Sequence, residues 1–266
     1  MFKIFQADAF TSKIFGGNPA AVVPLEEWLD DAVLQSIAAE NNLAETAYLV
    51  PVSSGWELRW FTPTAEVALC GHATLAAAHV LVTQLGCTDK VLNFETRESG
   101  TLTVECKKNG SFALSFPSIP VLESNEVPKI GAALGRKPDC VMYGHYSPDQ
   151  IDFVAVYETE DIVSALRPNF SNFKELNSRG IIATARGDSC DFVSRYFGPN
   201  FGIDEDPVTG SAHCLLTPYW SDIFGKLEME ARQISPRGGE IHCTLDNDRV
   251  VLTGSAVNYL AGTIYI

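Results

Sequence analysis

The sequence predicts an α+β protein of two similar domains, each a curled, mostly antiparallel sheet around one buried helix. Residues 59–63 (RWFTP) match 195–199 (RYFGP) at a spacing of 195 − 59 = 136, and residues 71–73 match 210–212 at 210 − 71 = 139. Both spacings are close to half of the 266 residues, and such repetition indicates repeated structural units. Many short strands with one helix per half are not the alternation of a doubly wound sheet.

The first half begins with an alternating segment that predicts a strand over residues 2–8. A turn containing Gly16 and Gly17 follows, and the spacing of apolar residues predicts an amphipathic helix over 28–41. A second helix, 72–85, is apolar on nearly every face, so we expect it to be buried all round. The other strands expected in this half are 20–23, 45–51, 56–61, 90–97, 101–106 and 111–116.

A Pro-rich segment over 115–128 interrupts the pattern and predicts domains of 1–118 and 119–266, with the alternative that the last strand returns to the first domain. The second half then repeats the order of the first, with its buried helix at 211–225. A helical region is expected at 159–177, and strands are expected at 140–145, 151–157, 180–185, 190–197, 226–234, 240–245, 249–254 and 257–265.

Composition excludes several classes of function. A net charge of −14 disfavours a nucleic-acid or anionic-membrane partner, which would require a basic face. We find neither a run of about 18 apolar residues nor a signal-peptide pattern, so we expect no membrane span. The seven cysteines are scattered without a Cys-x-x-Cys pair, which indicates reduced thiols and a cytoplasmic location. The five histidines lack metal-ligand spacing, so we expect no metal.

The two buried helices begin with small or polar residues, at Gly71 and at Gly210-Ser211. Helix N-termini expose backbone N–H groups that bind carboxylates and phosphates, which predicts a small anionic substrate in a cleft shared by both helix starts. The alternative for the second helix is ordinary capping by Thr209 or Ser211.

An acidic loop precedes the second buried helix, and Asp206 is its last carboxylate, fixed by the proline that follows. A carboxylate there can accept hydrogen bonds from an amine or hydroxyl, or act as a weak base. Glu66 occupies a comparable place in the first half. The alternative is an ordinary solvated acidic loop.

Three titratable residues near the first helix start are candidates for proton transfer. His72 stands at the first helical position, where the helix dipole predicts a neutral ring able to donate or accept a proton, or else a surface capping residue. Glu45 opens a strand, where an apolar setting would suit it for general acid/base work, the alternative being a solvent-exposed strand edge. Cys70 is either a thiol with a lowered pKa or a buried, inert cysteine.

Several ordered motifs resemble the PhzF-like isomerase family of phenazine biosynthesis, within the diaminopimelate-epimerase-like fold. They are ADAFT (7–11), GNPAAV (17–22), NLAETAY (42–48), RWFTP (59–63), EVALCGHATLA (66–76), DEDPVTGSA (204–212) and RGGE (237–240). The resemblance implies two similar domains with the active site in the cleft between them, a homodimer, and no metal, nucleotide or pyridoxal cofactor.

The resemblance also implies roles for individual residues. Glu45 matches the catalytic acid/base, and the matches to substrate-binding positions are Gly71, His72, Asp206, Gly210 and Ser211. The implied activity is that of a cofactor-independent isomerase that moves a proton on a small carboxylate-bearing substrate. Residues 70–74 read CGHAT where the phenazine enzyme has Ala-Gly-His-Pro, and 206–209 read DPVT where it has Asp-Ala-Ala-Thr. The substrate of that enzyme, trans-2,3-dihydro-3-hydroxyanthranilate, therefore does not transfer directly.

Two alternatives stay open. An amino-acid epimerase or racemase of the diaminopimelate-epimerase type needs two opposed cysteines. Cys70 could be one of them, but no cysteine lies between Asp206 and Gly210, and Cys214 stands a full turn into the helix. The other alternative is a non-catalytic protein that binds a small molecule.

Overall fold

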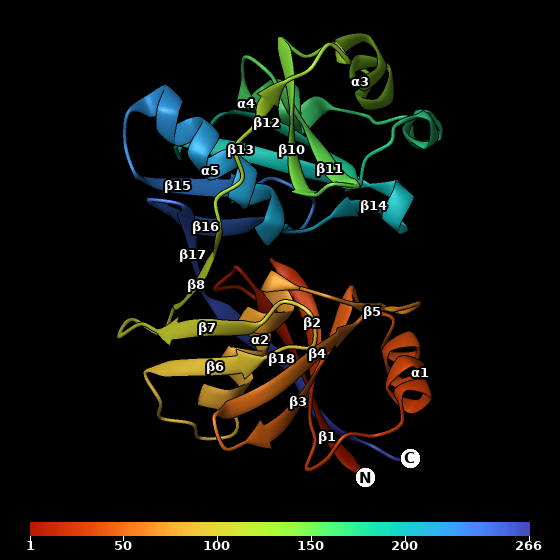
Figure 1. Cartoon of the computed structure of the whole chain (residues 1–266), viewed down its shortest axis with the longest axis vertical. Coiled ribbons are helices and arrows are strands. Elements are labelled where there is room, and N and C mark those ends of the chain that lie inside the picture. Colours follow the sequence, from red (N-terminus) through yellow and green to blue (C-terminus); the bar gives the residue numbers. More distant parts are fainter. The chain divides into compact units, whose positions relative to one another are not determined.

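The computed structural model describes residues 1–266, apart from the side chain of Phe201. The chain forms two compact units (Figure 1): unit 1 contains Met1–Ser115 and Thr253–Ile266, and unit 2 contains Phe116–Leu252. The predicted domains, 1–118 and 119–266, differ from these units chiefly at the C-terminus. The last strand, β18 (Ala256–Ile264), pairs antiparallel with β1 (Phe2–Ala9), so the chain ends in unit 1.

The first part of the chain holds two helices, α1 (Asp31–Asn41) and α2 (Gly71–Thr83). Its strands are β1, β2 (Asn18–Pro24), β3 (Glu45–Val52), β4 (Gly55–Phe61), β5 (Glu66–Val67), β6 (Val91–Glu95), β7 (Thr101–Cys106) and β8 (Phe112–Pro117).

The second part holds the helices α3 (Val127–Leu134), α4 (Glu160–Ala165) and α5 (Gly210–Phe224), and the 3₁₀ turns η1 (Phe170–Glu175) and η2 (Pro199–Phe201). Its strands are β9 (Leu122–Glu123), β10 (Cys140–Ser147), β11 (Gln150–Val156), β12 (Gly180–Arg186), β13 (Phe192–Gly198), β14 (Ile203–Asp206), β15 (Glu228–Gln233), β16 (Gly239–Asp246) and β17 (Arg249–Gly254).

The strand pairings of the two units correspond one to one. In unit 1, β1 and β2 are antiparallel, β2 and β3 parallel, β3 and β4 antiparallel, and β4 and β6 parallel. In unit 2 the same sequence of pairings joins β10 to β11, β11 to β12, β12 to β13 and β13 to β15. The duplication seen in the motifs is therefore a duplication of topology.

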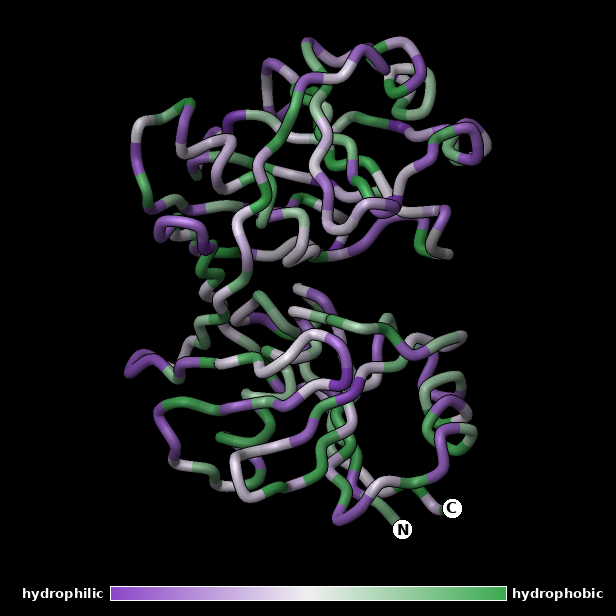
Figure 2. The backbone as a smooth tube through the Cα atoms, in the orientation of Figure 1, coloured by the Kyte–Doolittle hydropathy of each residue, from purple (hydrophilic) through white to green (hydrophobic). Residues whose placement is uncertain are grey.

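One helix forms the centre of each unit. Every residue from His72 to Leu81 of α2 is buried, and the helix packs against β1, β2, β3 and β18. In unit 2, α5 packs against β15 and β16 and is buried along most of its length. Figure 2 shows hydrophilic residues in turns such as that between β7 and β8. The predicted pattern of a sheet around a buried helix is confirmed. Among the described residues, no helix combines the length and apolar character needed to cross a membrane.

A buried arginine occupies the same place in both units. Arg59 of β4 binds Glu66 through two hydrogen bonds of 2.7 Å, and Arg195 of β13 binds Glu205 through two of 2.7 and 2.8 Å. The counterpart of Glu66 is therefore Glu205, so comparing Glu66 with Asp206 was wrong by one residue.

Several elements differ from the prediction, among them the acidic segment 204–206, which was expected as a loop and lies in the strand β14. The expected helical region 159–177 is broken into α4 and η1, and the Pro-rich segment taken as a boundary contains the start of α3. Helix α3 has a proline in its first turn and ends at Gly135, whose φ of 77° suits glycine. Both are typical helix-end signals.

The buried ring of His213 in α5 makes stability depend on pH. Its Nδ1 lies 2.9 Å from the carbonyl oxygen of Thr209, and burial lowers its pKa from 6.5 to about 4. As pH falls, the unfolded chain takes up this proton before the folded one does. The free energy of unfolding is therefore unaffected by His213 above pH 6.5. It falls by about 3 kcal/mol in all as the pH is lowered from 6.5 towards about 4.

Urea denaturation near pH 7.5 and near pH 4.5 measures this loss, and a His213→Leu variant should show a smaller difference between the two conditions. An equal pH dependence in both proteins would contradict the assignment to His213.

Candidate active site

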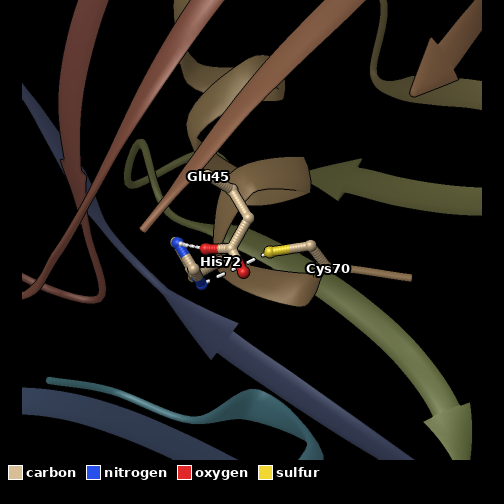
Figure 3. Close-up of side chains that lie close together, drawn as sticks. All are labelled: Glu45, Cys70 and His72. Carbon is tan, nitrogen blue, oxygen red and sulfur yellow. Dashed lines mark hydrogen bonds and ion pairs between the residues drawn. The ribbon is translucent and has the colours of Figure 1, made fainter. Parts of the chain in front are cut away.

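A glutamate, a histidine and a cysteine meet at the start of α2 (Figure 3). The Nε2 atom of His72 lies 3.1 Å from a carboxylate oxygen of Glu45, and its Nδ1 atom lies 3.4 Å from the thiol of Cys70. The side-chain nitrogen of Asn18 lies 3.3 Å from the same Nδ1. The two ring nitrogens thus face different partners, with the carboxylate on one and the thiol and amide on the other.

Local folding explains this meeting. Glu45 opens β3, and parallel pairing sets it opposite Ala20, two residues after Asn18 opens β2. His72, in the first turn of α2, contacts both Asn18 and Glu45, so this turn lies where β2 and β3 begin. Cys70 is the extended residue before α2, and its side chain caps no helical N–H.

The electrostatics of His72 differ from the expectation. Burial alone lowers the pKa of His72, but Cys70 and the Glu45 carboxylate raise it, so that the pKa lies well above its usual value. This direction does not support the prediction of a neutral His72, which considered the helix dipole and not the neighbours Cys70 and Glu45. Since His72 is only 6% exposed, the surface-capping alternative is wrong.

The two neighbours of His72 are enclosed as well. The Glu45 side chain is 13% exposed, so the solvent-exposed alternative for this residue was wrong. Burial and the Glu45 carboxylate raise the pKa of the Cys70 thiol, which contradicts the alternative of a lowered pKa.

Although the sequence predicted no metal, the three donor atoms of Glu45, Cys70 and His72 lie within 4.8 Å of one another. Sulfur, imidazole and carboxylate are also ligands that zinc uses in proteins.

The predicted residues of unit 2 lie around the first turn of α5. The Asp206 carboxylate accepts a short hydrogen bond from the Thr209 hydroxyl, and the Thr209 N–H donates to the side chain of Gln233 at 2.8 Å. The hydroxyl of Thr209 therefore does not cap α5. Asp206 is half-buried and engaged, so the alternative of a simple solvated loop does not describe it.

Ser211 has a partner that the sequence did not indicate. A terminal nitrogen of Arg179 donates to its hydroxyl oxygen at 3.2 Å, and the hydroxyl oxygen of Tyr146 lies 3.1 Å from its carbonyl oxygen. Gly210, the residue before it, is buried. The structure thus places Glu45 and His72 together in unit 1, and Asp206, Gly210 and Ser211 along one helix start in unit 2.

Comparison with solved structures agrees with this fold. The crystal structure of a PhzF-family phenazine biosynthesis protein from Enterococcus faecalis superposes with a TM-score of 0.93 at 43% identity, covering 100% of this chain and 99% of that one. A predicted epimerase from Pseudomonas aeruginosa shares the fold, with a TM-score of 0.77 at 18% identity and 100% coverage of both chains. The fold is that of the PhzF and epimerase-like proteins.

Sequence comparison identifies the family. The PhzC-PhzF profile, described as phenazine biosynthesis-like protein, matches residues 7–262. An uncharacterized isomerase of Pseudomonas aeruginosa is 46% identical over 263 residues, covering 99% of this chain and 98% of that relative. The chain belongs to the phenazine biosynthesis-like PhzC-PhzF family.

Proposed function

We propose that the protein is a cofactor-independent isomerase that moves a proton on a small carboxylate-bearing substrate. The observation that carries this proposal is the enclosed carboxylate of Glu45, 3.1 Å from a ring nitrogen of His72. A relative that is 46% identical along nearly its whole length is named an isomerase, which supports the same reaction class.

The proposed reaction is a proton transfer by Glu45. Its carboxylate takes a proton from an acidic carbon of the substrate and returns a proton to a different atom, so the double bond of the substrate shifts and no electrons are gained or lost. The proposed role of His72, whose Nε2 lies 3.1 Å from Glu45, is to orient the carboxylate. The proposed role of Asp206 is to orient the substrate, while Gly71, Gly210 and Ser211 would bind its carboxylate group.

A conversion assay tests this function. Small cyclic amino and hydroxy acids, including trans-2,3-dihydro-3-hydroxyanthranilate, are incubated with the protein and followed by proton NMR, with and without EDTA. We expect one compound to be converted into an isomer at a rate that EDTA leaves unchanged. Loss of conversion in EDTA would point instead to a metal held by Glu45, Cys70 and His72. Binding without conversion would favour a non-catalytic protein.

Substitution of Cys70 separates the isomerase from an epimerase. In the structure the thiol is buried with a raised pKa, so we expect Cys70→Ser to change the conversion rate by less than about tenfold. No cysteine stands where an epimerase would need its second one, and Cys214, a full turn into α5, contacts the carbonyl oxygen of Gly210. Cys214→Ser is the companion variant. Loss of α-carbon exchange in either variant would support the epimerase.

A further inference from the structure

The duplicated topology identifies the residue of unit 2 that corresponds to Glu45. The pairing of β3 with β4 sets Thr46 opposite Phe61, and the pairing of β12 with β13 sets Ile181 opposite Phe197. Because Phe61 and Phe197 are equivalent residues of the repeated motif, the first residue of β3 corresponds to the first residue of β12, which is Gly180. The 136-residue spacing of the repeated motif, applied to Glu45, would give Ile181 instead.

Unit 2 has no room for an acid at this position. A Cβ atom on Gly180 would lie 2.6 Å from the carbonyl oxygen of Phe197 and 2.7 Å from the ring and hydroxyl of Tyr196. The side chain that reaches the start of α5 comes instead from the preceding residue, Arg179, whose guanidinium donates to Ser211. Since Ser211 matches His72 in the repeat, the carboxylate–imidazole pair of unit 1 is replaced in unit 2 by a guanidinium–hydroxyl pair.

Arg179 is held in place by a buried polar cluster. Its guanidinium carbon lies 4.2 Å from the centre of the Tyr146 ring, and its Nε lies 3.8 Å from a carboxylate oxygen of Asp152. The two oxygens of this carboxylate accept hydrogen bonds from the hydroxyls of Tyr146, at 3.0 Å, and Tyr196, at 3.3 Å. Asp152 is fully buried, a costly place for a charge unless partners surround it.

The cluster fixes the arginine without enclosing it. The side chain of Arg179 is 21% exposed, whereas those of Arg59 and Arg195, the arginines of the duplicated motif, are 3% and 10% exposed. Arg59 and Arg195 each donate two hydrogen bonds to a glutamate. An arginine that is positioned but still accessible is suited to bind an anion from solution.

We propose that Arg179 and Ser211 form a subsite that recognises a carboxylate group, with Asp152 and Tyr196 as positioning residues. The planar guanidinium matches the two oxygens of a carboxylate, and a serine hydroxyl can accept from Arg179 and donate to the anion at once. This inference rests on the proposed function, because it takes the carboxylate to be that of the substrate. It adds Arg179 as the residue that selects a negatively charged substrate.

Calorimetric titration of the full chain tests the subsite with benzoate and 2-aminobenzoate and with the corresponding amides as probes. Loss of a charged hydrogen bond predicts that Arg179→Gln weakens carboxylate binding about 10- to 100-fold and leaves the already weak amide binding unchanged. Arg179→Lys, which keeps the charge, should bind at an intermediate level. Arg186→Gln is the matched control, because Arg186 is an exposed arginine at the far end of β12, the strand that follows Arg179, and it should bind as the wild-type protein does.

Three results would overturn the subsite. The first is a wild-type protein that binds none of the carboxylates or binds the amides equally well. The second is an Arg179→Gln variant that binds the carboxylates like the wild type. The third is equal loss of binding in Arg179→Gln and Arg179→Lys with a lowered melting temperature, which would show a structural role. Because binding is measured without turnover, carboxylate binding that depends on Arg179 but comes with no isomerisation would contradict the proposed function alone.

Discussion

Replacement of Glu45 by glutamine is expected to lower the rate of proton transfer about 100- to 10,000-fold, the range that a general acid/base supplies. Glutamine keeps the shape of the side chain and can still contact His72, 3.1 Å away in the wild type, but it cannot accept a proton at neutral pH. The measurement is the rate at which a converted compound exchanges hydrogen with solvent.

The matched control is Glu40→Gln, which removes a carboxylate from an exposed position of α1 and should leave the rate unchanged. Near-UV circular dichroism confirms that both variants are folded. A Glu45→Gln protein with a rate within about threefold of the wild type would remove Glu45 from the mechanism.

Replacement of Arg195 by methionine is expected to destabilise the protein by about 3 to 5 kcal/mol, as is usual when one member of a buried ion pair is removed. The substitution leaves the Glu205 carboxylate without its two hydrogen bonds. It also removes the donor shared by the carbonyl oxygens of Val163, Ser164 and Leu166, at 3.1 to 3.3 Å. Urea denaturation at neutral pH measures the change.

The double variant Arg195→Met/Glu205→Leu is the informative companion. It removes the uncompensated carboxylate, so it should recover part of the stability lost in Arg195→Met. If Arg195→Met lowers the free energy of unfolding by less than about 1 kcal/mol, the Arg195–Glu205 pair contributes no more than a surface salt bridge does. The structural role assigned to the pair would then be wrong.

The repeated motifs predicted much of the fold. The matching Arg-x-Phe segments correctly located β4 and β13, which carry equivalent neighbours in the two units. An apolar residue at nearly every position predicted that α2 is buried. These features depend on local sequence, which explains why sequence alone was sufficient. Helix α3 was missed, although its first-turn proline and its terminal Gly135 were visible signals.

The candidate site was harder to predict, because its properties come from neighbours distant in the chain. His72 is 27 residues from Glu45 (72 − 45), yet the carboxylate raises the pKa that the helix dipole was expected to lower. Arg179 escaped notice because its partner Ser211 is 32 residues away and no motif connects them. Only the duplicated strand register shows that Arg179 adjoins the counterpart of Glu45.

The central claim is that Glu45 returns the proton to a different atom of the substrate, and the position of solvent deuterium in the product tests it most directly. The wild-type protein is incubated in D₂O with a compound that it converts, and the product is examined by mass and proton spectra. The account predicts an isomer with deuterium at a carbon other than the one that lost its proton. Deuterium at the original α-carbon with inverted configuration would contradict it, whereas direct return of the same proton by Glu45 would give the isomer without deuterium.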